Sequence, residues 1–379
     1  MTTQYKIPLL PVEFDFETKG ILSQLNKASR KLAELKGVAL TIPNENILLS
    51  SLVLQEAKDS SAVENIVTTS DDLFKADLKL KNEVVNAAAK EVLNYREAMW
   101  RGFDLVRKNH LLTLKDIKAI QQVLEDNNAG FRTVPGTSLK TTTGVVVYTP
   151  PQSNAEIVEL MANLERYINI PEIHDVDPLI KLAIIHHQFE SIHPFYDGNG
   201  RTGRILLILY LVINDLLDLP ILYLSRYITH NKGEYYRLIQ EIREYAPDNF
   251  KQWEEWIIFM LRGVEETAEE TIRLVKSISQ LMAKFKRILK PIFGSQYKHE
   301  LINNLFFHPY TKIDFMSKDM MVQRKTAAKY LDKIAEVGLL EKVKIGRSNY
   351  YINAELMKLF IDQGNVRIEP TEQIESVSL

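Results

Sequence analysis

The run from residue 193 to 204, which reads HPFYDGNGRTGR, constrains the fold and chemistry of this chain more than any other feature. Gly198, Asn199 and Gly200 stand directly before an apolar stretch that predicts a buried helix. Glycines allow backbone conformations in which several N–H groups point at one spot. A helix N-terminus adds unpaired N–H groups and the positive end of the helix dipole. The run therefore predicts a loop that binds an anion, such as phosphate, at the start of a helix.

The side chains around this loop suit phosphate chemistry. Arg201 and Arg204 are three positions apart, so both can face the loop from the first helical turn and pair with phosphate oxygens. Asp197 could hold Mg²⁺, which binds one or two carboxylates together with phosphate oxygens. His193 has the pKa range of a general base, and we expect Phe195 to anchor the loop in the core. The set suits attack by a hydroxyl group on a phosphate of a nucleotide.

Each of these features also has a plain structural explanation. Asp-Gly-Asn-Gly sequences are common turns, and a single histidine is more often structural than catalytic. We favour the chemical interpretation because a base, a metal ligand, an anion loop and two arginines all fall within one short run.

The pattern His-x-Phe-x-Asp-Gly-Asn-Gly-Arg-x-x-Arg, as it stands at 193–204, resembles the signature of the Fic family without a departure. The resemblance implies a mainly α fold with a helical core and a β-hairpin "flap" that docks a target protein. It also implies an enzyme that uses ATP and Mg²⁺ to attach AMP to Ser, Thr or Tyr hydroxyls of proteins, itself included. The Thr- and Val-rich segment 131–151 lies where the flap is expected.

The resemblance assigns a role to each position of the motif. It implies that His193 is the base, Asp197 the Mg²⁺ ligand, and Arg201 and Arg204 the contacts of the β- and γ-phosphates. The residues that it places at the ATP site are Glu64, His193, Gly198, Asn199, Gly200, Arg201, Thr202, Gly203, Arg204, Tyr235 and Tyr236. The two tyrosines resemble residues that border an adenine pocket, but packing of either ring in the core is an equally good interpretation.

The segment Ser60-Ser61-Ala62-Val63-Glu64-Asn65 supports two interpretations at once. Ser61-x-x-Glu64 is a capping box, which predicts the start of a helix at about 60–67. The same segment resembles the family's inhibitory motif, Ser/Thr-x-x-x-Glu-Gly/Asn. That resemblance implies that the Glu64 carboxylate pairs with Arg204 and so blocks the productive binding of ATP, while Ser61 still caps the helix.

Several functional alternatives stay open at this point. Some members of the family use the inhibitory glutamate to remove AMP from targets. Another nucleotide or a phosphocholine donor could replace ATP, although the pair of arginines favours a triphosphate. The Fic core could also act as a nucleotide-sensing module in a DNA-binding regulator.

Helical periodicity dominates the chain, and hairpin patterns mark two places. We expect helices over 21–35, 47–54, 62–67, 79–106, 113–124, 154–168, 177–189, 205–216, 232–245 and 250–289, with a break at 58–61. The predicted domains are an N-terminal helical region at 1–100, a Fic core at 101–290, a winged helix at 291–365 and a flexible tail at 366–379.

The C-terminal part predicts a small winged helix-turn-helix domain. Helices are expected at 299–307, 311–316 and 322–337, followed by a hairpin at 340–352. The recognition helix would expose Gln323, Arg324, Lys325, Lys329 and Lys333, and the wing would carry Lys342, Lys344 and Arg347. This local basic face fits DNA, but winged helices also serve as protein docking or dimer modules.

Composition restricts the setting in which the chain works. The formal net charge is -2, so no global field draws the protein to nucleic acid or to a membrane. Cysteine is absent, which fits a reducing compartment. The N-terminus has no secretion signal, and the longest apolar stretch, 205–213, is too short to span a bilayer. We expect a cytoplasmic protein with no membrane partner, and the resemblance to regulated family members suggests a homodimer.

Overall fold

The computed structural model describes residues 5–69, 73, 86–141, 143–345 and 348–361. The chain divides into two compact units between Lys276 and Ser277. Both units are mainly helical with small antiparallel sheets, which confirms the predicted fold class. We expected a boundary near Pro291, but helix α11 (Phe250–Phe293) is continuous and contains that proline in its last turns. Among the described residues, no helix is long and apolar enough to cross a membrane.

The first unit is built around two helices that are buried on nearly all sides. These are α7 (Pro178–Ile192) and α8 (Asn199–Ile213), whose residues are almost all buried. They pack against each other, and Gly203 allows their close approach because a Cβ there would lie 3.0 Å from Phe189 and Glu190. The motif that the sequence singled out spans the connection between these two helices and the first residues of α8, so the core itself positions it.

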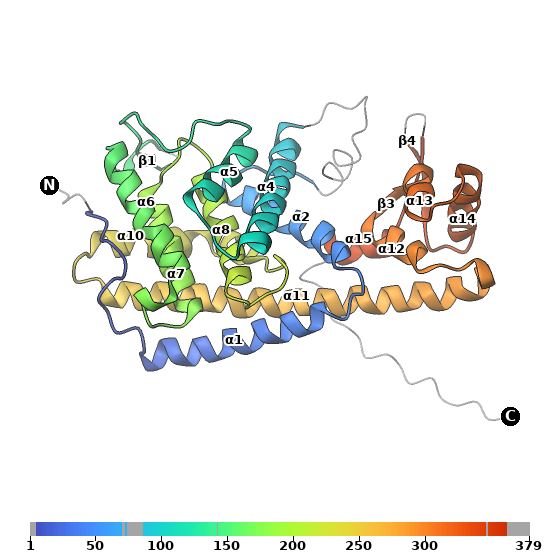
Figure 1. Cartoon of the computed structure of the whole chain (residues 1–379), viewed down its shortest axis with the longest axis horizontal. Coiled ribbons are helices and arrows are strands. Elements are labelled where there is room, and N and C mark those ends of the chain that lie inside the picture. The colour runs from blue at the N-terminus through green and yellow to red at the C-terminus, as the bar shows by residue number, and fades with distance from the viewer. Residues whose placement is uncertain (1–4, 70–72, 74–85, 142, 346–347, 362–379) are drawn as a thin grey trace. The chain divides into compact units, whose positions relative to one another are not determined.

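Other helices surround this central pair. The first unit also contains α1 (Lys19–Ala39), α2 (Glu45–Val63), α4 (Ala87–Asn109), α5 (Leu114–Glu125), α6 (Asn154–Asn169), α9 (Leu224–His230) and α10 (Lys232–Glu244). Figure 1 shows α1 running along α11, and ion pairs such as Lys31–Glu269 and Lys276–Glu34 join the two helices. Helices α2, α4 and α8 contact one another, which brings the end of α2 to the start of α8.

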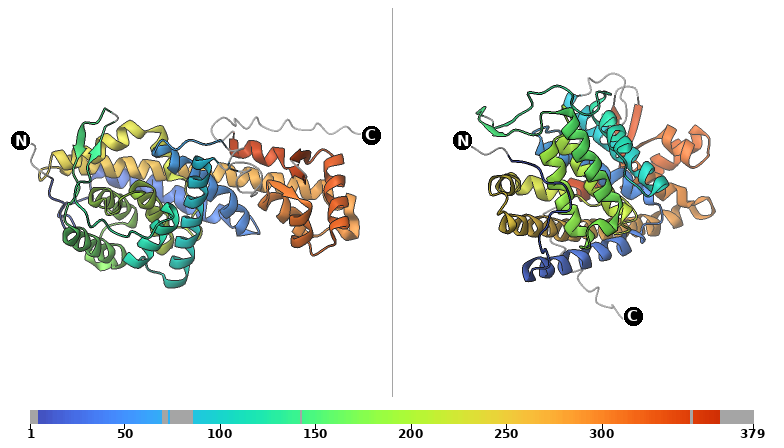
Figure 2. Two further views of the ribbon diagram at one scale, coloured as in Figure 1. Left: turned by 90° about the horizontal axis from the view of Figure 1, so that it is seen from above. Right: turned by 60° about the vertical axis from the view of Figure 1, so that its left-hand side comes forward.

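The flap is present as a short hairpin. Strands β1 (Leu139–Lys140) and β2 (Val146–Tyr148) pair antiparallel, with Leu139 opposite Tyr148. The hairpin lies at the edge of the first unit in the right-hand view of Figure 2, and Gln240 of α10 donates a hydrogen bond to the Val147 carbonyl at 3.0 Å. The predicted hairpin at 131–151 is therefore confirmed as the location of the strands, although only its outer part is regular.

Helix α2 contradicts two predictions. We expected a break at 58–61 and a new helix over 60–67, with Ser61 as its cap. Instead, α2 runs through both serines and ends at Val63, and Glu64 and Asn65 form the turn after it. Asn65 adopts a left-handed conformation with φ 63, which asparagine tolerates at a helix end. Ser60 and Ser61 are buried within the helix, and among the described residues the Ser61 hydroxyl has no hydrogen-bond partner, so it caps nothing there.

The second unit combines helices with a three-stranded sheet. The helices are α12 (His299–Phe307), α13 (Ile313–Asp319), α14 (Arg324–Glu336) and α15 (Ala354–Ile361). Strands β3 (Tyr310–Lys312), β4 (Glu341–Ile345) and β5 (Ser348–Ile352) form an antiparallel sheet in the order β3-β5-β4. The sequence analysis missed β3 and α15, which are three and eight residues long. The predicted tail at 366–379 and Arg347 lie outside the described residues.

Candidate active site

The connection between α7 and α8 is a preformed loop held from within. The Asn199 side chain accepts a hydrogen bond from the Phe195 N–H (2.8 Å) and donates one to the Phe195 carbonyl (2.9 Å). The Phe195 ring is fully buried and packs against Phe131 and Phe189, as expected for an anchor. The side chain of Asn199 therefore braces the loop, and its backbone N–H contributes to the start of α8.

Gly198 and Gly200 form the open side of the loop, and each lies against a carboxylate. Gly198 has a φ of 76, and a Cβ at this position would lie 2.3 Å from Glu125 Oε1. A Cβ at Gly200 would lie 2.3 Å from Glu64 Oε1 and 3.0 Å from Arg204 Nη1. Two carboxylates of the chain thus lie where the sequence predicts that an anionic ligand binds. The two carboxylates are held beside the glycines by ion pairs, Glu125 with Arg201 and Glu64 with Arg204.

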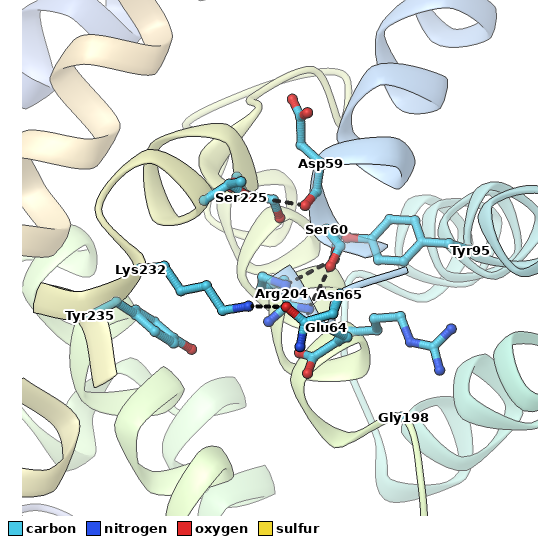
Figure 3. Close-up of polar contacts among 12 residues, drawn as sticks. Asp59, Ser60, Glu64, Asn65, Tyr95, Gly198, Arg204, Ser225, Lys232 and Tyr235 are labelled. Atoms are coloured by element: carbon cyan, nitrogen blue, oxygen red, sulfur yellow. Dashed lines mark hydrogen bonds and ion pairs between the residues drawn. The ribbon is translucent and has the colours of Figure 1, made fainter. Parts of the chain in front are cut away.

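The side chain of Arg204 is bound by residues at the end of α2. Its Nε donates to Ser60 Oγ and its Nη2 to the Ser60 carbonyl, both at 2.9 Å, and Nη2 also pairs with Glu64 Oε1 at 2.8 Å. Figure 3 shows these contacts meeting at Arg204. The Arg204 side chain is 2% exposed and that of Glu64 34%. Burial favours a raised pKa of Glu64, but the charge of Arg204 outweighs it and lowers the pKa below the ordinary value. Glu64 is therefore ionised at neutral pH.

Further contacts fix the end of α2 to its neighbours. The buried carboxylate of Glu56 accepts hydrogen bonds from the Ser225 N–H (3.1 Å) and the Tyr95 hydroxyl (3.1 Å). Burial raises the pKa of Glu56 to about 8. Beyond Glu64, the Asn65 side chain accepts a hydrogen bond from Lys232 Nζ at 2.9 Å (Figure 3). These contacts hold α2 in the register that brings Glu64 to Arg204.

Arg201 is paired with two carboxylates that sequence reasoning missed. Its Nη1 contacts Glu91 of α4 at 2.9 Å, and its Nη2 contacts Glu125 of α5 at 2.8 Å. Burial raises the pKa of Glu125, although Arg201 opposes this shift. No motif marks these glutamates in the sequence, because only the packing of α4 and α5 on α8 brings them to Arg201.

His193 ends α7 in an unusual backbone conformation, with φ 48 and ψ 57. The pKa of His193 is lowered to about 4, mainly by burial. The nearby charges of Arg132 and Arg243 lower it as well, and the smaller effect of Glu64 opposes them. The imidazole is therefore neutral at neutral pH and can accept a proton, as a general base must. Asp197, four residues later, is exposed, and its Oδ1 accepts a hydrogen bond from the Gly198 N–H.

The donor set at Asp197 fits a magnesium ion that phosphate helps to bind. Among the described residues, no group of three or more histidine or acidic side chains could hold a metal ion by itself. Mg²⁺ commonly takes one or two protein carboxylates and fills its other positions with phosphate oxygens and water. An exposed single carboxylate beside an anion loop matches that requirement.

The remaining predicted residues divide between the core and the surface. Thr202 is buried within α8, and Gly203 faces α7, so packing accounts for Gly203. Tyr235 is 1% exposed and its hydroxyl lies 2.7 Å from His186 Nε2, which favours the core interpretation for this ring. Tyr236 is 45% exposed and packs edge-on against Tyr235, so it stays a predicted contact of the nucleotide base.

Three family models match consecutive parts of the chain. The Fic/DOC family N-terminal model matches residues 22–104, and the Fic/DOC family model matches 111–211, which includes the whole motif. The chain belongs to the Fic family. A third model, the C-terminal domain of SoFic-like protein adenylyltransferases, matches 281–356. The three matched ranges follow one another along the chain without overlap.

Curated relatives of this Fic-family chain carry adenylyltransferase names. The protein adenylyltransferase Fic of Culex quinquefasciatus is 31% identical over 118 residues, which are 31% of this chain and 23% of that protein. A probable protein adenylyltransferase of Aquifex aeolicus is 50% identical over 54 residues, or 14% of this chain and 17% of that protein. The aligned stretches thus span less than a quarter of either relative.

Solved Fic structures share the fold of the chain. A Fic family protein from Desulfovibrio desulfuricans G20 has a TM-score of 0.55 at 17% identity, covering 91% of this chain and 98% of that one. A Fic domain containing signaling protein from Bacteroides thetaiotaomicron has a TM-score of 0.51 at 19% identity, covering 69% of this chain and 97% of that one. At these identities the similarity establishes the fold.

Proposed function

We propose that this chain is a protein adenylyltransferase, which transfers AMP from ATP to Ser, Thr or Tyr hydroxyls of target proteins and of itself. The observation that carries the proposal is the loop at 193–204. It joins a neutral, half-buried His193 to a glycine-rich helix start, where the carboxylates of Glu125 and Glu64 lie close to Gly198 and Gly200. The adenylyltransferase names of the relatives support the same reaction class.

In the proposed reaction, His193 takes the proton from the target hydroxyl as its oxygen attacks the α-phosphorus of ATP. The bond from the α-phosphorus to the bridging oxygen breaks, and pyrophosphate leaves. The loop N–H groups and the two arginines, Arg201 and Arg204, bind the phosphate oxygens. Mg²⁺ at Asp197 would supply charge neutralisation on the phosphates when bound.

The flap provides a docking strand for the target in this proposal. Val146 and Val147 of β2 are 51% and 44% exposed, and Val145 just before the strand is 62% exposed, so three apolar side chains in a row face solvent. An extended peptide can add to such an edge through main-chain hydrogen bonds, with little demand on its side chains. This mode of docking would place many different hydroxyl residues near the loop.

We further propose that Glu64 inhibits the reaction in cis. Its carboxylate occupies the position against Gly200 and Arg204 that a phosphate group needs. ATP would then bind only in a pose that does not lead to transfer. Removal of AMP by the same glutamate is the alternative activity, and incubation of AMP-modified protein without ATP tests it.

The most informative test is the intact mass of the protein after incubation with ATP and Mg²⁺. The wild type, Glu64→Gly and His193→Ala are compared under one condition. We expect Glu64→Gly to gain the mass of an adenylyl group on a hydroxyl residue, and His193→Ala to gain none. An unmodified Glu64→Gly protein would reject transfer to itself, and a different added mass would identify another donor.

A DNA-binding role is the second candidate function, and the surface of the second unit favours it. Lys325, Lys329 and Lys333 of α14 are exposed, as are Lys342 and Lys344 of β4. We propose this face as the recognition surface of a winged helix. Binding to duplex DNA that weakens steeply with salt would support it, whereas salt-independent self-association would favour a dimer module. The cytoplasmic location and the homodimer also stay predictions.

A further inference from the structure

Arg132 lies at the start of the flap segment, and its charged side chain is buried. The residue is 1% exposed, and it belongs to no helix or strand. A buried guanidinium group costs free energy unless partners satisfy its donors. The hydrogen bonds of Nε and Nη2 go to backbone carbonyl oxygens, and the buried Nη1 has no partner among the described residues. Nε donates to His193 O at 2.8 Å, and Nη2 donates to Pro151 O at 3.0 Å and to Ile192 O at 3.5 Å.

Two of these carbonyls belong to the end of the helix that carries the predicted base. The last carbonyls of a helix lack partners within it, and a cation near them also stabilises the negative end of the dipole. His193 itself has a left-handed backbone, with φ 48 and ψ 57. A residue without a glycine's freedom keeps such a conformation only where its surroundings fix it. Arg132 supplies part of that fixation.

The backbone of Arg132 adds contacts to both sides of the same junction. Its N–H donates to the Pro194 carbonyl at 2.8 Å, and its carbonyl accepts a hydrogen bond from the Asn154 side chain at 2.7 Å. Pro151 follows the hairpin, whereas Arg132 precedes it. One residue therefore ties the first and last parts of the flap segment to the residues on either side of His193.

We infer that Arg132 is a positioning residue for the transfer reaction, because it holds the flap and the His193 backbone in one fixed arrangement. This inference rests on the proposed function. The flap docks the target hydroxyl and His193 accepts its proton, so the distance between them depends on the junction that Arg132 makes. A misplacement of about 1 Å can lower a reaction rate about a hundredfold.

The charges around His193 allow a second measurement of the role of Arg132, through the pKa of His193. Arg132 approaches it from the flap segment, Arg243 from α10, and Glu64 from the end of α2. Both arginines favour the neutral imidazole, and Glu64 favours the protonated one. Loss of the Arg132 charge should therefore raise the pKa of His193, whether or not the protein transfers AMP.

The test uses Arg132→Met and Arg132→Lys in the full-length Glu64→Gly protein, with Gln152→Ala as the matched control. Gln152 binds Gly136 N and the carbonyls of Thr137 and Pro150, so the control loosens the base of the flap without touching His193. Self-modification is measured at saturating ATP and at half-maximal ATP. His193 is titrated by NMR, with its resonance assigned from His193→Gln.

For Arg132→Met we expect the rate at saturating ATP to fall about a hundredfold, with the half-maximal ATP concentration changed less than about twofold. The pKa of His193 should rise in this variant. Lysine keeps the charge but cannot fork to two carbonyls, so Arg132→Lys should restore the titration and leave the rate about tenfold low. Gln152→Ala should lower the rate less than either variant.

The inference is overturned if Arg132→Lys has the full rate, or if Arg132→Met loses no more than Gln152→Ala. If Arg132→Met does not fold, Arg132→Lys alone decides the matter. If the Glu64→Gly protein transfers no AMP to itself, the self-modification part of the proposed function fails. The His193 titration in Arg132→Met then decides about Arg132 independently, since an unchanged pKa would remove its link to His193.

Discussion

Arg201 and Arg204 lie three residues apart at the start of α8, and the chain holds both with its own carboxylates. Arg201 pairs with Glu91 and Glu125, and Arg204 pairs with Glu64 and also contacts Ser60. In each case one carboxylate also lies against a glycine of the loop, Glu125 at Gly198 and Glu64 at Gly200. The two arrangements are similar in chemistry and differ in what supports them.

The supports differ in how easily each carboxylate can leave. Glu91 and Glu125 belong to α4 and α5, which make extensive contacts with each other and with α8. Glu64 follows the last turn of α2, where Asn65 already leaves the helix. A change of that one turn would remove Glu64, the one carboxylate that forms an ion pair with Arg204 among the described residues. Glu125 is likewise the last residue of α5, but if it turned away Arg201 would keep its ion pair with Glu91. We propose from this difference that Arg204 is the contact that regulation changes and that Arg201 keeps a carboxylate partner.

The largest expected effect is the loss of self-modification when the base is removed, and it shows whether the rate can be used to compare the two arginines. In the Glu64→Gly protein, His193→Ala should lower self-modification by about 10²- to 10⁴-fold, because no other group takes the proton. The measurement is the incorporation of labelled AMP at saturating ATP and Mg²⁺. Retained activity would show that the base lies elsewhere. The rate would then not report on the roles of Arg201 and Arg204 at this site.

The next prediction concerns how strongly the Glu64–Arg204 ion pair stabilises the folded chain. We expect the free energy of unfolding of Glu64→Gln to be about 1–2 kcal/mol lower than that of the wild type at neutral pH. This value takes into account that Glu64 is partly exposed. Because the pKa of Glu64 is lowered in the folded chain, this stabilisation exists above the ordinary value of 4.5 and is lost as the pH falls through the folded pKa.

Urea unfolding of both proteins across this pH range tests the pair. The difference between the wild type and Glu64→Gln should shrink progressively below pH 4.5. A difference that is the same at every pH would mean that the ion pair does not cause it.

The smallest expected effect concerns Arg201. Glu125→Gln in the Glu64→Gly protein should lower the half-maximal ATP concentration about two- to fivefold, since one of two ion pairs that compete with phosphate is removed. Glu91 remains as a partner, so the change should be small. A rise of the rate as large as that caused by Glu64→Gly would contradict the distinction between the two arginines.

Sequence reasoning located the loop from a short, local pattern, whereas the Glu64–Arg204 contact joins residues 140 positions apart and was expected only from the resemblance to the family's inhibitory motif. The glycines, the arginines and Glu64 each carry a signature that is readable within a few residues. Glu91 and Glu125 carry none, because helix packing alone brings them to Arg201. The error at α2 has a related origin. Two serines predict the start of a helix, but burial and the bond from Arg204 keep Ser60 inside one.

The central claim is that Glu64 and the γ-phosphate compete for Arg204, and the initial rate of self-modification tests it most directly. The wild type is compared with Glu64→Gly and with Glu91→Gln, which removes a carboxylate from the other arginine. The account predicts a rate about 10- to 100-fold above wild type for Glu64→Gly and less than about threefold above it for Glu91→Gln. Equal rates in the wild type and Glu64→Gly would contradict it.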